Sequence, residues 1–333
     1  MKIKKLLINL CTVFFLSCQI GNFMEEKSEN SSNLKIACWN VQTFFDANTD
    51  GDEYYEFKKS SAWGIDAYEK RLKKLCSAIK SIDADVFIME EIENEKVLLD
   101  INNFLAGEWN TKKTYPYACF AKNEGSSIGC AVISRVPLKN LTVHSLDIRS
   151  ENSKLPSVRP IMQLTVCAKK EFVLLVNHWK SKSGGEAATE IWRNRQEGLL
   201  QKIVESLESK TDQILIAGDF NRDIHDFYSP QENSGNILLR KWIDGKLIKD
   251  GTLVKSAWYL DGEKIIEPGS YYFNGEWSRI DNIFTAGNLK LKAFYPETDG
   301  PWCNSSTFIP QKYIMRTGSG YSDHLPLFCI ISL

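Results

Sequence analysis

The sequence predicts a single mixed α/β domain in which two packed β-sheets are covered by helices. Apolar runs typical of strands outnumber segments with helical periodicity, and both kinds occur throughout the region from residue 34 to 333. No internal repeat or linker divides this region. Because every sheet and helix must bury an apolar face, such a mixture is most stable as packed layers.

Each element follows from the period of its apolar residues. In the first helix, Leu72, Leu75 and Ile79 recur at helical spacing opposite a Lys/Glu-rich face. Helices are predicted at residues 66–82, 97–105 and 186–207. Strands are predicted at residues 34–41, 85–89, 117–121, 129–134, 141–146, 160–166, 172–177, 213–217, 280–284, 289–294 and 325–331.

Composition restricts the class of protein. Of 333 residues, 43% are hydrophobic and 25% are charged, which suits one large domain or two small ones. The formal net charge of −1 excludes overall basicity as a means of binding nucleic acid. Contact with a polyanion therefore requires a local basic patch or a bound cation.

The N-terminus has the pattern of an export signal. Three early lysines precede an apolar run, Leu6 to Leu16, that is too short to span a membrane comfortably. Ser17-Cys18 resembles the cleavage box of bacterial lipoproteins, in which the cysteine is lipidated. The alternative is an ordinary signal peptide with an incidental cysteine.

These features predict three segments: a signal peptide at residues 1–18, a flexible tether at 19–33 and a folded domain at 34–333. We expect an exported protein that contacts the membrane only through its N-terminal lipid at the cell envelope. Without the lipid it would be periplasmic or extracellular.

Nine cysteines in an exported protein raise the question of disulfides. Two lie in the leader, and Cys38, Cys130, Cys167 and Cys329 lie in apolar strand-like runs, where a thiol behaves as a small hydrophobe. We expect mostly free core thiols, with room for one disulfide.

Polar residues suited to metal and phosphate chemistry lie at the ends of several predicted strands. Strand ends converge in proteins built on sheets, so residues distant in sequence are expected to form one site. The set comprises Asn40, Glu91, Arg159, His178, Asp219, Asn221, Asp281, Asp323 and His324.

The acidic members predict a site for Mg²⁺ or Mn²⁺. Mg²⁺ prefers a few oxygen ligands and retains several waters, so one or two carboxylates suffice beside substrate phosphate. Glu91 is the leading ligand because it directly follows an apolar strand, and Asn40 and Asp323 are expected to complete the shell.

The remaining members fit hydrolysis of a phosphodiester, which needs an aligned water and stabilised phosphoryl oxygens. Asp219 is expected to orient or deprotonate the water, with Asn221 on the same side of the chain. His178 and His324 are expected to donate hydrogen bonds to the pentavalent centre. Asp281 suits His324 as the carboxylate that fixes its tautomer and raises its pKa.

Arg159 and Asn40 are expected to contact phosphate, Arg159 through a bidentate guanidinium contact. A surface salt bridge is the alternative for Arg159. Separately, the run from Asp46 to Gly51 resembles the start of a calcium loop, although Phe57 occupies the twelfth position and Glu56 the eleventh. Structural Ca²⁺ is therefore a minor expectation beside an acidic turn.

Taken in order, these motifs resemble the endonuclease/exonuclease/phosphatase superfamily, over nearly all of residues 34–332. Gly218-Asp219-Phe220-Asn221 with Ser322-Asp323-His324 carries most of the resemblance. It implies a four-layer α/β sandwich of two mainly antiparallel sheets flanked by helices, with the predicted domain as its catalytic unit. It also implies the metal role of Glu91 and the phosphate role of Arg159.

Two positions depart from the pattern of this superfamily. Glu90 replaces the usual glutamine; it adds negative charge beside Glu91 and is expected to face solvent. The residues that orient the first catalytic histidine in the deoxyribonucleases have no counterpart around Ser126 to Gly129, which leaves the partner of His178 open.

The leading functional prediction is an exported, metal-dependent nuclease with DNA as its substrate. A sphingomyelinase-like or inositol-phosphate phosphoesterase is the first alternative, because aromatic residues such as Tyr271-Tyr272-Phe273 suit either bases or a lipid surface. A catalytically inactive surface binding protein is the second alternative. No feature implies a protein partner.

Overall fold

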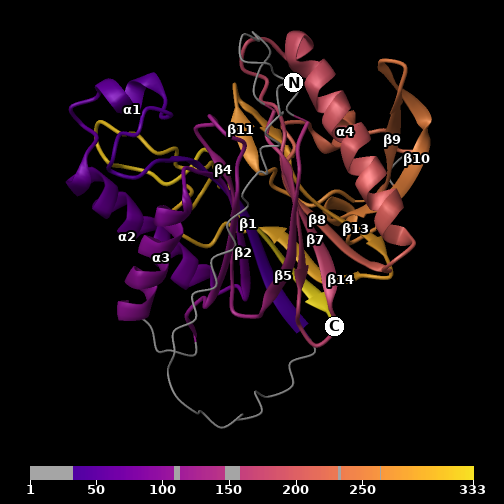
Figure 1. Cartoon of the computed structure of the whole chain (residues 1–333), viewed down its shortest axis with the longest axis horizontal. Helices are drawn as coiled ribbons and strands as arrows, with labels where there is room; N and C mark the ends of the chain where they lie inside the picture. Colours follow the sequence, from indigo (N-terminus) through magenta and orange to yellow (C-terminus); the bar gives the residue numbers. More distant parts are fainter. Residues whose placement is uncertain (1–32, 109–112, 147–157, 232–233, 263) are drawn as a thin grey trace, which may run out of the picture.

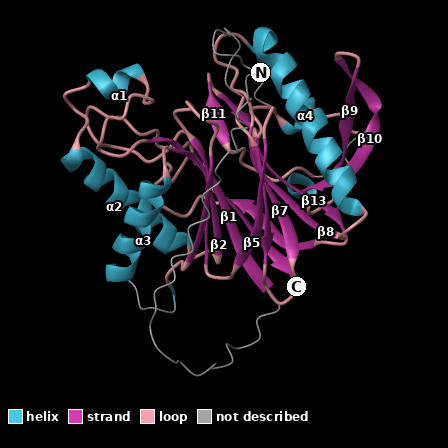
Figure 2. Cartoon of the chain, in the orientation of Figure 1, coloured by secondary structure: helices cyan, strands magenta, loops and turns pink. Residues whose placement is uncertain are grey.

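The computed structural model describes residues 33–108, 113–146, 158–231, 234–262 and 264–333. Two β-sheets lie face to face in the centre, and helices cover both outer surfaces (Figures 1 and 2). This arrangement confirms the predicted α/β sandwich. The export signal and nearly all of the tether lie outside the described residues, so export stays a prediction; Asn33 already belongs to the first strand.

Within these ranges, the first sheet has six strands in the order β14-β15-β1-β2-β4-β3. The strands are β1 (Asn33–Phe44), β2 (Val86–Ile92), β3 (Tyr117–Ala121), β4 (Gly129–Ser134), β14 (Lys290–Pro296) and β15 (Leu327–Ser332). All neighbours pair antiparallel except β1 and β2, which run parallel. The carboxyl ends of β1 and β2 therefore lie side by side.

The second sheet has seven described strands in the order β5-β6-β7-β8-β13-β10-β9. They are β5 (Leu138–His144), β6 (Ile161–Val166), β7 (Phe172–His178), β8 (Gln213–Asp219), β9 (Asn236–Ile243), β10 (Lys246–Ser256) and β13 (Asp281–Gly287). Here β7 and β8 are the parallel pair. A small hairpin, β11 (Tyr271–Phe273) and β12 (Glu276–Ser278), lies outside both sheets.

Helices α2 and α3 cover the first sheet and α4 covers the second (Figure 1). The α-helices are α1 (Tyr55–Lys59), α2 (Ile65–Ile82), α3 (Glu95–Glu108) and α4 (Glu186–Glu208), and the short 3₁₀ helices are η2 (Ile224–Asp226) and η3 (Ala257–Tyr259). The apolar stripe of α2, including Leu72 and Ile79, packs in one core with Trp39 and Phe87. None of these helices combines the length and apolarity that crossing a bilayer requires.

Alternation along β1 divides the interior into two cores. Ile36 and Cys38 face the second sheet, whereas Ala37 and Trp39 face α2 and α3. The seven cysteines in the described part of the chain are all free, and all but Cys167 are buried. They are core thiols as expected, and the structure forms no disulfide among them.

Candidate active site

Strand ends from both sheets meet at one rim of the sandwich. Asn40 and Glu91 come from the adjacent parallel strands β1 and β2. His178 and Asp219 are the last residues of the parallel strands β7 and β8 and are paired in register. Asp281, which begins the antiparallel strand β13, lies opposite Asp219. The convergence expected from the sequence is therefore present.

Four of these side chains contact one another across the two sheets. The Asn40 amide nitrogen lies 3.0 Å from Asp219 Oδ2 and 3.3 Å from Glu91 Oε1. His178 Nε2 lies 3.6 Å from Asp219 Oδ2 and 3.7 Å from Glu91 Oε1. Asn40 thus orients two carboxylates at once, and the imidazole faces the same pair.

A strained turn aims Glu91 at this rim. Strict alternation along β2 would direct Glu91 toward the helices, but the pairing of β2 with β4 is irregular between Glu90 and Ile92. Glu91 adopts a φ of +68°, a left-handed conformation that is rare for a residue with a Cβ. The backbone N–H of Thr43 donates to its second carboxylate oxygen. Such strain persists where surrounding contacts hold it and is concentrated at functional sites.

Asp219 is buried and is oriented by amide groups rather than by a basic side chain. The backbone N–H of Asn221 donates to Oδ1 at 2.8 Å, and the Asn221 side chain donates to Oδ2 at 3.1 Å. Burial, followed by the charge of Asp281, raises the pKa of Asp219 to about 7. Asn221 also donates to the carbonyl of Trp179, which fixes its position.

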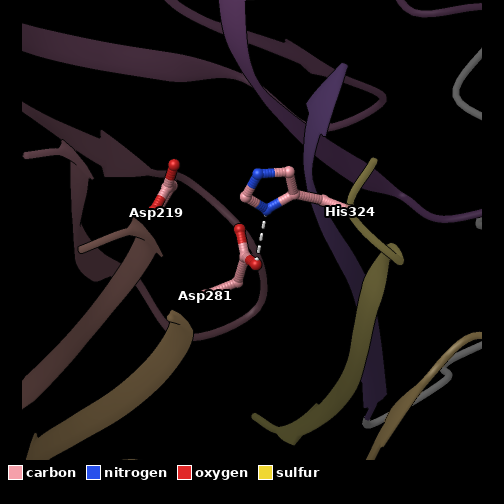
Figure 3. Close-up of side chains that lie close together, drawn as sticks. All are labelled: Asp219, Asp281 and His324. Carbon is pink, nitrogen blue, oxygen red and sulfur yellow. Dashed lines mark hydrogen bonds and ion pairs between the residues drawn. The ribbon is translucent and has the colours of Figure 1, made fainter. Parts of the chain in front are cut away.

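Asp281 and His324 form a buried hydrogen-bonded pair. His324 Nδ1 lies 2.8 Å from Asp281 Oδ2, and the second ring nitrogen lies on the side of Asp219 (Figure 3). Burial alone lowers the pKa of His324, but the charge and hydrogen bond of Asp281 outweigh it and hold that pKa well above its usual range. The partnership expected for these two residues is therefore present, with His324 as an imidazolium.

Three residues that the sequence analysis named, Ser322, Tyr271 and Asp323, lie around His324. Ser322 Oγ donates to the carbonyl of Asn40 at 2.6 Å and accepts the backbone N–H of His324. The ring of Tyr271, from β11, packs on the imidazole with centroids 4.8 Å apart. Asp323 Oδ1 lies 4.0 Å from His324 Nε2. The motif Ser322-Asp323-His324 is visible in the sequence, but the contacts of Ser322 and Tyr271 with His324 have no local signal in it.

The site opens into a cleft of about 1010 Å³. Its lining includes most of the predicted set, namely Asn40, Glu91, Arg159, Asp219, Asn221, Asp323 and His324. Arg159 is half-buried, donates to the carbonyl of Trp179 at 3.1 Å and has Tyr54 as a further hydrogen-bond partner. Its alternative role was a surface salt bridge, but Arg159 forms no salt bridge with any described residue. His178 and Asp281 lie behind the cleft wall.

Comparison with known proteins agrees with this geometry. The model of the Endonuclease/Exonuclease/phosphatase family matches residues 35–332. The chain belongs to this family. A search of curated proteins gives no match. The family includes metal-dependent phosphodiesterases and nucleases, and its recognition from the sequence is confirmed.

Solved structures of the endonuclease/exonuclease/phosphatase family share the fold at low identity. TDP2 from Caenorhabditis elegans is 16% identical, with a TM-score of 0.57 over 90% of this chain and 75% of that one. D. rerio TDP2, complexed with a single strand DNA product, is 15% identical, with a TM-score of 0.52 over 91% and 100% of the two chains. The human nocturnin catalytic domain is also 15% identical, with a TM-score of 0.52 over 90% and 94%.

The two departures from the family pattern have different outcomes. The expectation that Glu90 faces solvent is wrong. Glu90 is fully buried between the sheets, because it shares the inward face of β2 with Val86 and Ile88. The Cys38 thiol donates to Glu90 Oε1 at 3.3 Å, and burial raises the pKa of Glu90 well above its usual value. It is therefore a neutral carboxylic acid.

The partner of His178 remains open within the described residues. Its Nδ1 is buried without a hydrogen-bond partner there, and burial lowers the pKa of the ring well below its usual range. His178 is therefore neutral. Its predicted contact with the phosphoryl group stays a prediction, since the contacts seen are with Glu91 and Asp219.

Enzymes of this family use divalent metals, and the residues present fit such an ion. One carboxylate oxygen of Asp219 and one of Asp281 lie within 4.8 Å of each other and of a ring nitrogen of His324, which as an imidazolium is not itself a ligand. Glu91 adds a partly exposed carboxylate beside them. Hard oxygen donors of this kind suit Mg²⁺ or Mn²⁺ better than a thiophilic metal. The assignment of Glu91, Asn40 and Asp323 as the ligands stays a prediction.

Proposed function

We propose that this protein is a divalent-metal-dependent phosphodiesterase that hydrolyses DNA. One observation carries the proposal: Asn40 and Glu91 from one sheet contact His178 and Asp219 from the other within 3.7 Å. Beside them lies a charged imidazolium, on the floor of an open cleft. These parts together meet the needs of phosphodiester hydrolysis.

The chemistry divides among the residues by position. A bound divalent cation, held by Glu91, Asn40 and Asp323, would neutralise charge on the phosphoryl oxygens. The oxygen of a water attacks phosphorus, and Asp219 accepts the proton that this water loses. The bond from phosphorus to the leaving oxygen breaks. His324 stabilises the added negative charge on the phosphoryl oxygens, and the leaving oxygen takes a proton from solvent. The products are a phosphomonoester and an alcohol.

The lining of the cleft supports a nucleic-acid substrate. Arg159, Lys182 and Lys312 line the same cleft as the carboxylates and suit contacts to a phosphate backbone. The rings of Tyr271 and Phe273 are stacked on each other at the edge of the cleft, where a base can stack. The DNA product in the complex of D. rerio TDP2, which has the same fold, adds support from a related protein.

One observation favours a second candidate, a phosphoesterase that acts on a lipid headgroup. Phe273, on the β11–β12 hairpin beside the cleft, is 61% exposed, and Ile314 is 50% exposed. Apolar side chains held in water near a phosphate site suit a membrane surface. The same catalytic residues would then act on a different phosphodiester.

A panel of substrates separates these candidates. With MgCl₂ or MnCl₂, the purified protein should release acid-soluble nucleotides from DNA, and EDTA should stop the release. An Asp219→Asn variant prepared in parallel controls for contaminating nucleases. Phosphocholine release from sphingomyelin liposomes without DNA cleavage would show that the substrate is the lipid and not DNA. No turnover of any of these or of bis-p-nitrophenyl phosphate would favour a binding protein.

A further inference from the structure

A second group of acidic residues lies outside the catalytic set, in the loop that follows β1. The loop folds around Glu53, whose two carboxylate oxygens accept the backbone N–H groups of Asp50 and Gly51 at 2.6 and 3.0 Å. Asp46 accepts the N–H of Asn48 at 2.6 Å. Gly51 has a φ of +112°, which favours glycine there. The segment that resembled a calcium loop is thus a tight turn lined with carboxylates.

A remote acid completes this group. Glu93, just beyond β2, is 1% exposed, and its Oε2 accepts the backbone N–H of Asp46. Its Oε1 is buried and has no hydrogen-bond partner in the described residues. One oxygen from each of Asp50, Glu53 and Glu93 lies within 4.8 Å of the other two. The buried, unpartnered oxygen therefore belongs to a side chain that converges with two further carboxylates.

Basic side chains do not neutralise this group. Among the described residues, no lysine or arginine forms an ion pair with Asp50, Glu53 or Glu93; Lys96 lies 3.9 Å from Asp46 instead. A buried carboxylate oxygen without a hydrogen-bond donor is unfavourable, and so is the repulsion among three carboxylates that no described basic side chain neutralises. A cation bound between the three groups would remove both penalties.

We propose that Asp50, Glu53 and Glu93 form a second cation site that binds Ca²⁺. Ca²⁺ takes six to eight oxygen ligands in flexible geometry, whereas Mg²⁺ is usually held by one or two carboxylates and keeps its waters. Three converging carboxylates therefore favour Ca²⁺, with backbone carbonyls and water to complete the shell. Glu93 supplies the acid that is missing from the twelfth position of the loop, where Phe57 stands.

The site links this loop to the catalytic cleft. The chain continues from Glu53 directly into Tyr54 and helix α1, and Tyr54 and Phe57 line the cleft. Both rings pack on Phe45, with centroids 5.5 and 4.6 Å away. Bound Ca²⁺ would fix this wall of the cleft and, through Tyr54, the side of Arg159. This inference stands whether DNA or a lipid is the substrate.

Thermal unfolding with and without Ca²⁺ tests the site. The parent is Glu91→Gln, which weakens the catalytic metal site and so isolates the second one. At pH 8, saturating CaCl₂ should raise the melting temperature of this parent by about 5 °C relative to EDTA. Adding Glu93→Gln should abolish most of that shift. Adding Asp52→Asn, which removes an exposed charge of the same loop from outside the group, should preserve it.

The order of the variants gives a second criterion. In EDTA, the Glu93→Gln variant should melt at or above its parent, because a neutral amide replaces an unpaired buried acid; in CaCl₂ it should melt below. A Ca²⁺ shift that is absent, or equal with Glu93→Gln and Asp52→Asn, overturns the proposal. A shift seen in the wild type but lost in Glu91→Gln assigns Ca²⁺ to the catalytic site instead and also overturns it.

Discussion

Two groups of buried acids in this protein differ in what neutralises them. Behind the second sheet, Glu197 of α4 is fully buried between two guanidinium groups. Arg240 donates to it through Nε, Nη2 and the backbone N–H at 2.8, 2.9 and 3.0 Å, and Arg222 contacts its other side. The negative charge of Glu197 is therefore neutralised by two arginines, and both of its carboxylate oxygens accept hydrogen bonds.

At the rim, Asp219 and Asp281 are buried just as deeply but have no arginine or lysine within ion-pair distance in the described part of the chain. Asp219 has amide donors and a neutral imidazole, and only Asp281 has a charged partner, His324. The difference teaches that burial alone does not mark an active site. What distinguishes the candidate active site is buried negative charge that no described lysine or arginine of the protein neutralises.

The sharpest test of this contrast is to remove the rim residues. Asp219→Ala and His324→Ala should each lower turnover by about 10²- to 10⁴-fold, because each removes a proton acceptor or a stabilising charge from the transition state. The melting temperature of Asp219→Ala should stay close to that of the wild type, because no lysine or arginine among the described residues is paired with Asp219. His324→Ala should melt lower but remain folded, because it leaves Asp281 buried without its charged partner. Steady-state kinetics and thermal unfolding on the same preparations measure both. Collapse of the fold in both variants would contradict the site assignment.

Removing Glu197, the acid that two arginines neutralise, should lower stability and leave turnover unchanged. Glu197→Ala leaves Arg222 and Arg240 without their shared partner, so the free energy of unfolding should fall by about 3–5 kcal/mol. Activity per folded molecule should persist, because Glu197 does not line the cleft. Urea unfolding and active-site titration check these outcomes. Lost turnover in fully folded protein would break the comparison and show that Arg222 also holds the segment of Asn221.

A smaller effect is expected at the edge of the rim. Glu91→Gln should weaken binding of Mg²⁺ or Mn²⁺ by at least about tenfold, because it removes a charged ligand and keeps the shape. Glu90→Gln is the matched control: it lies one residue away, but its neutral side chain points between the sheets. Calorimetric titration of both variants measures the affinities. Equal affinities for Glu91→Gln and wild type would remove Glu91 from the ligands.

The sequence was sufficient for most of the fold because apolar strands and amphipathic helices are local patterns. The β9–β10 hairpin was not predicted, since few residues of its strands are fully buried and many are polar. A signal did exist: Asp244-Gly245, both with positive φ, form the two-residue turn between the strands. An alternating polar ribbon at a sheet edge is predicted better from its turn than from its hydrophobicity.

Site residues at strand ends were also predictable, whereas their directions were only partly so. Alternation from Val86 and Ile88 already indicated that Glu90 faces inward, and this signal was overlooked. The irregularity at Glu91 has no local signature, and neither does the approach of Glu93 to the loop after β1. Such features arise from contacts between segments that are far apart in the chain.

The division of the catalytic residues between two sheets has a consequence for folding. Asn40 and Glu91 belong to one sheet and His178 and Asp219 to the other, so each sheet alone contains only half of these four residues. Secondary structure can return as each sheet forms, but hydrolysis can resume only when the two faces have docked in register. The rate at which turnover recovers during refolding therefore reports the rate at which the two sheets dock.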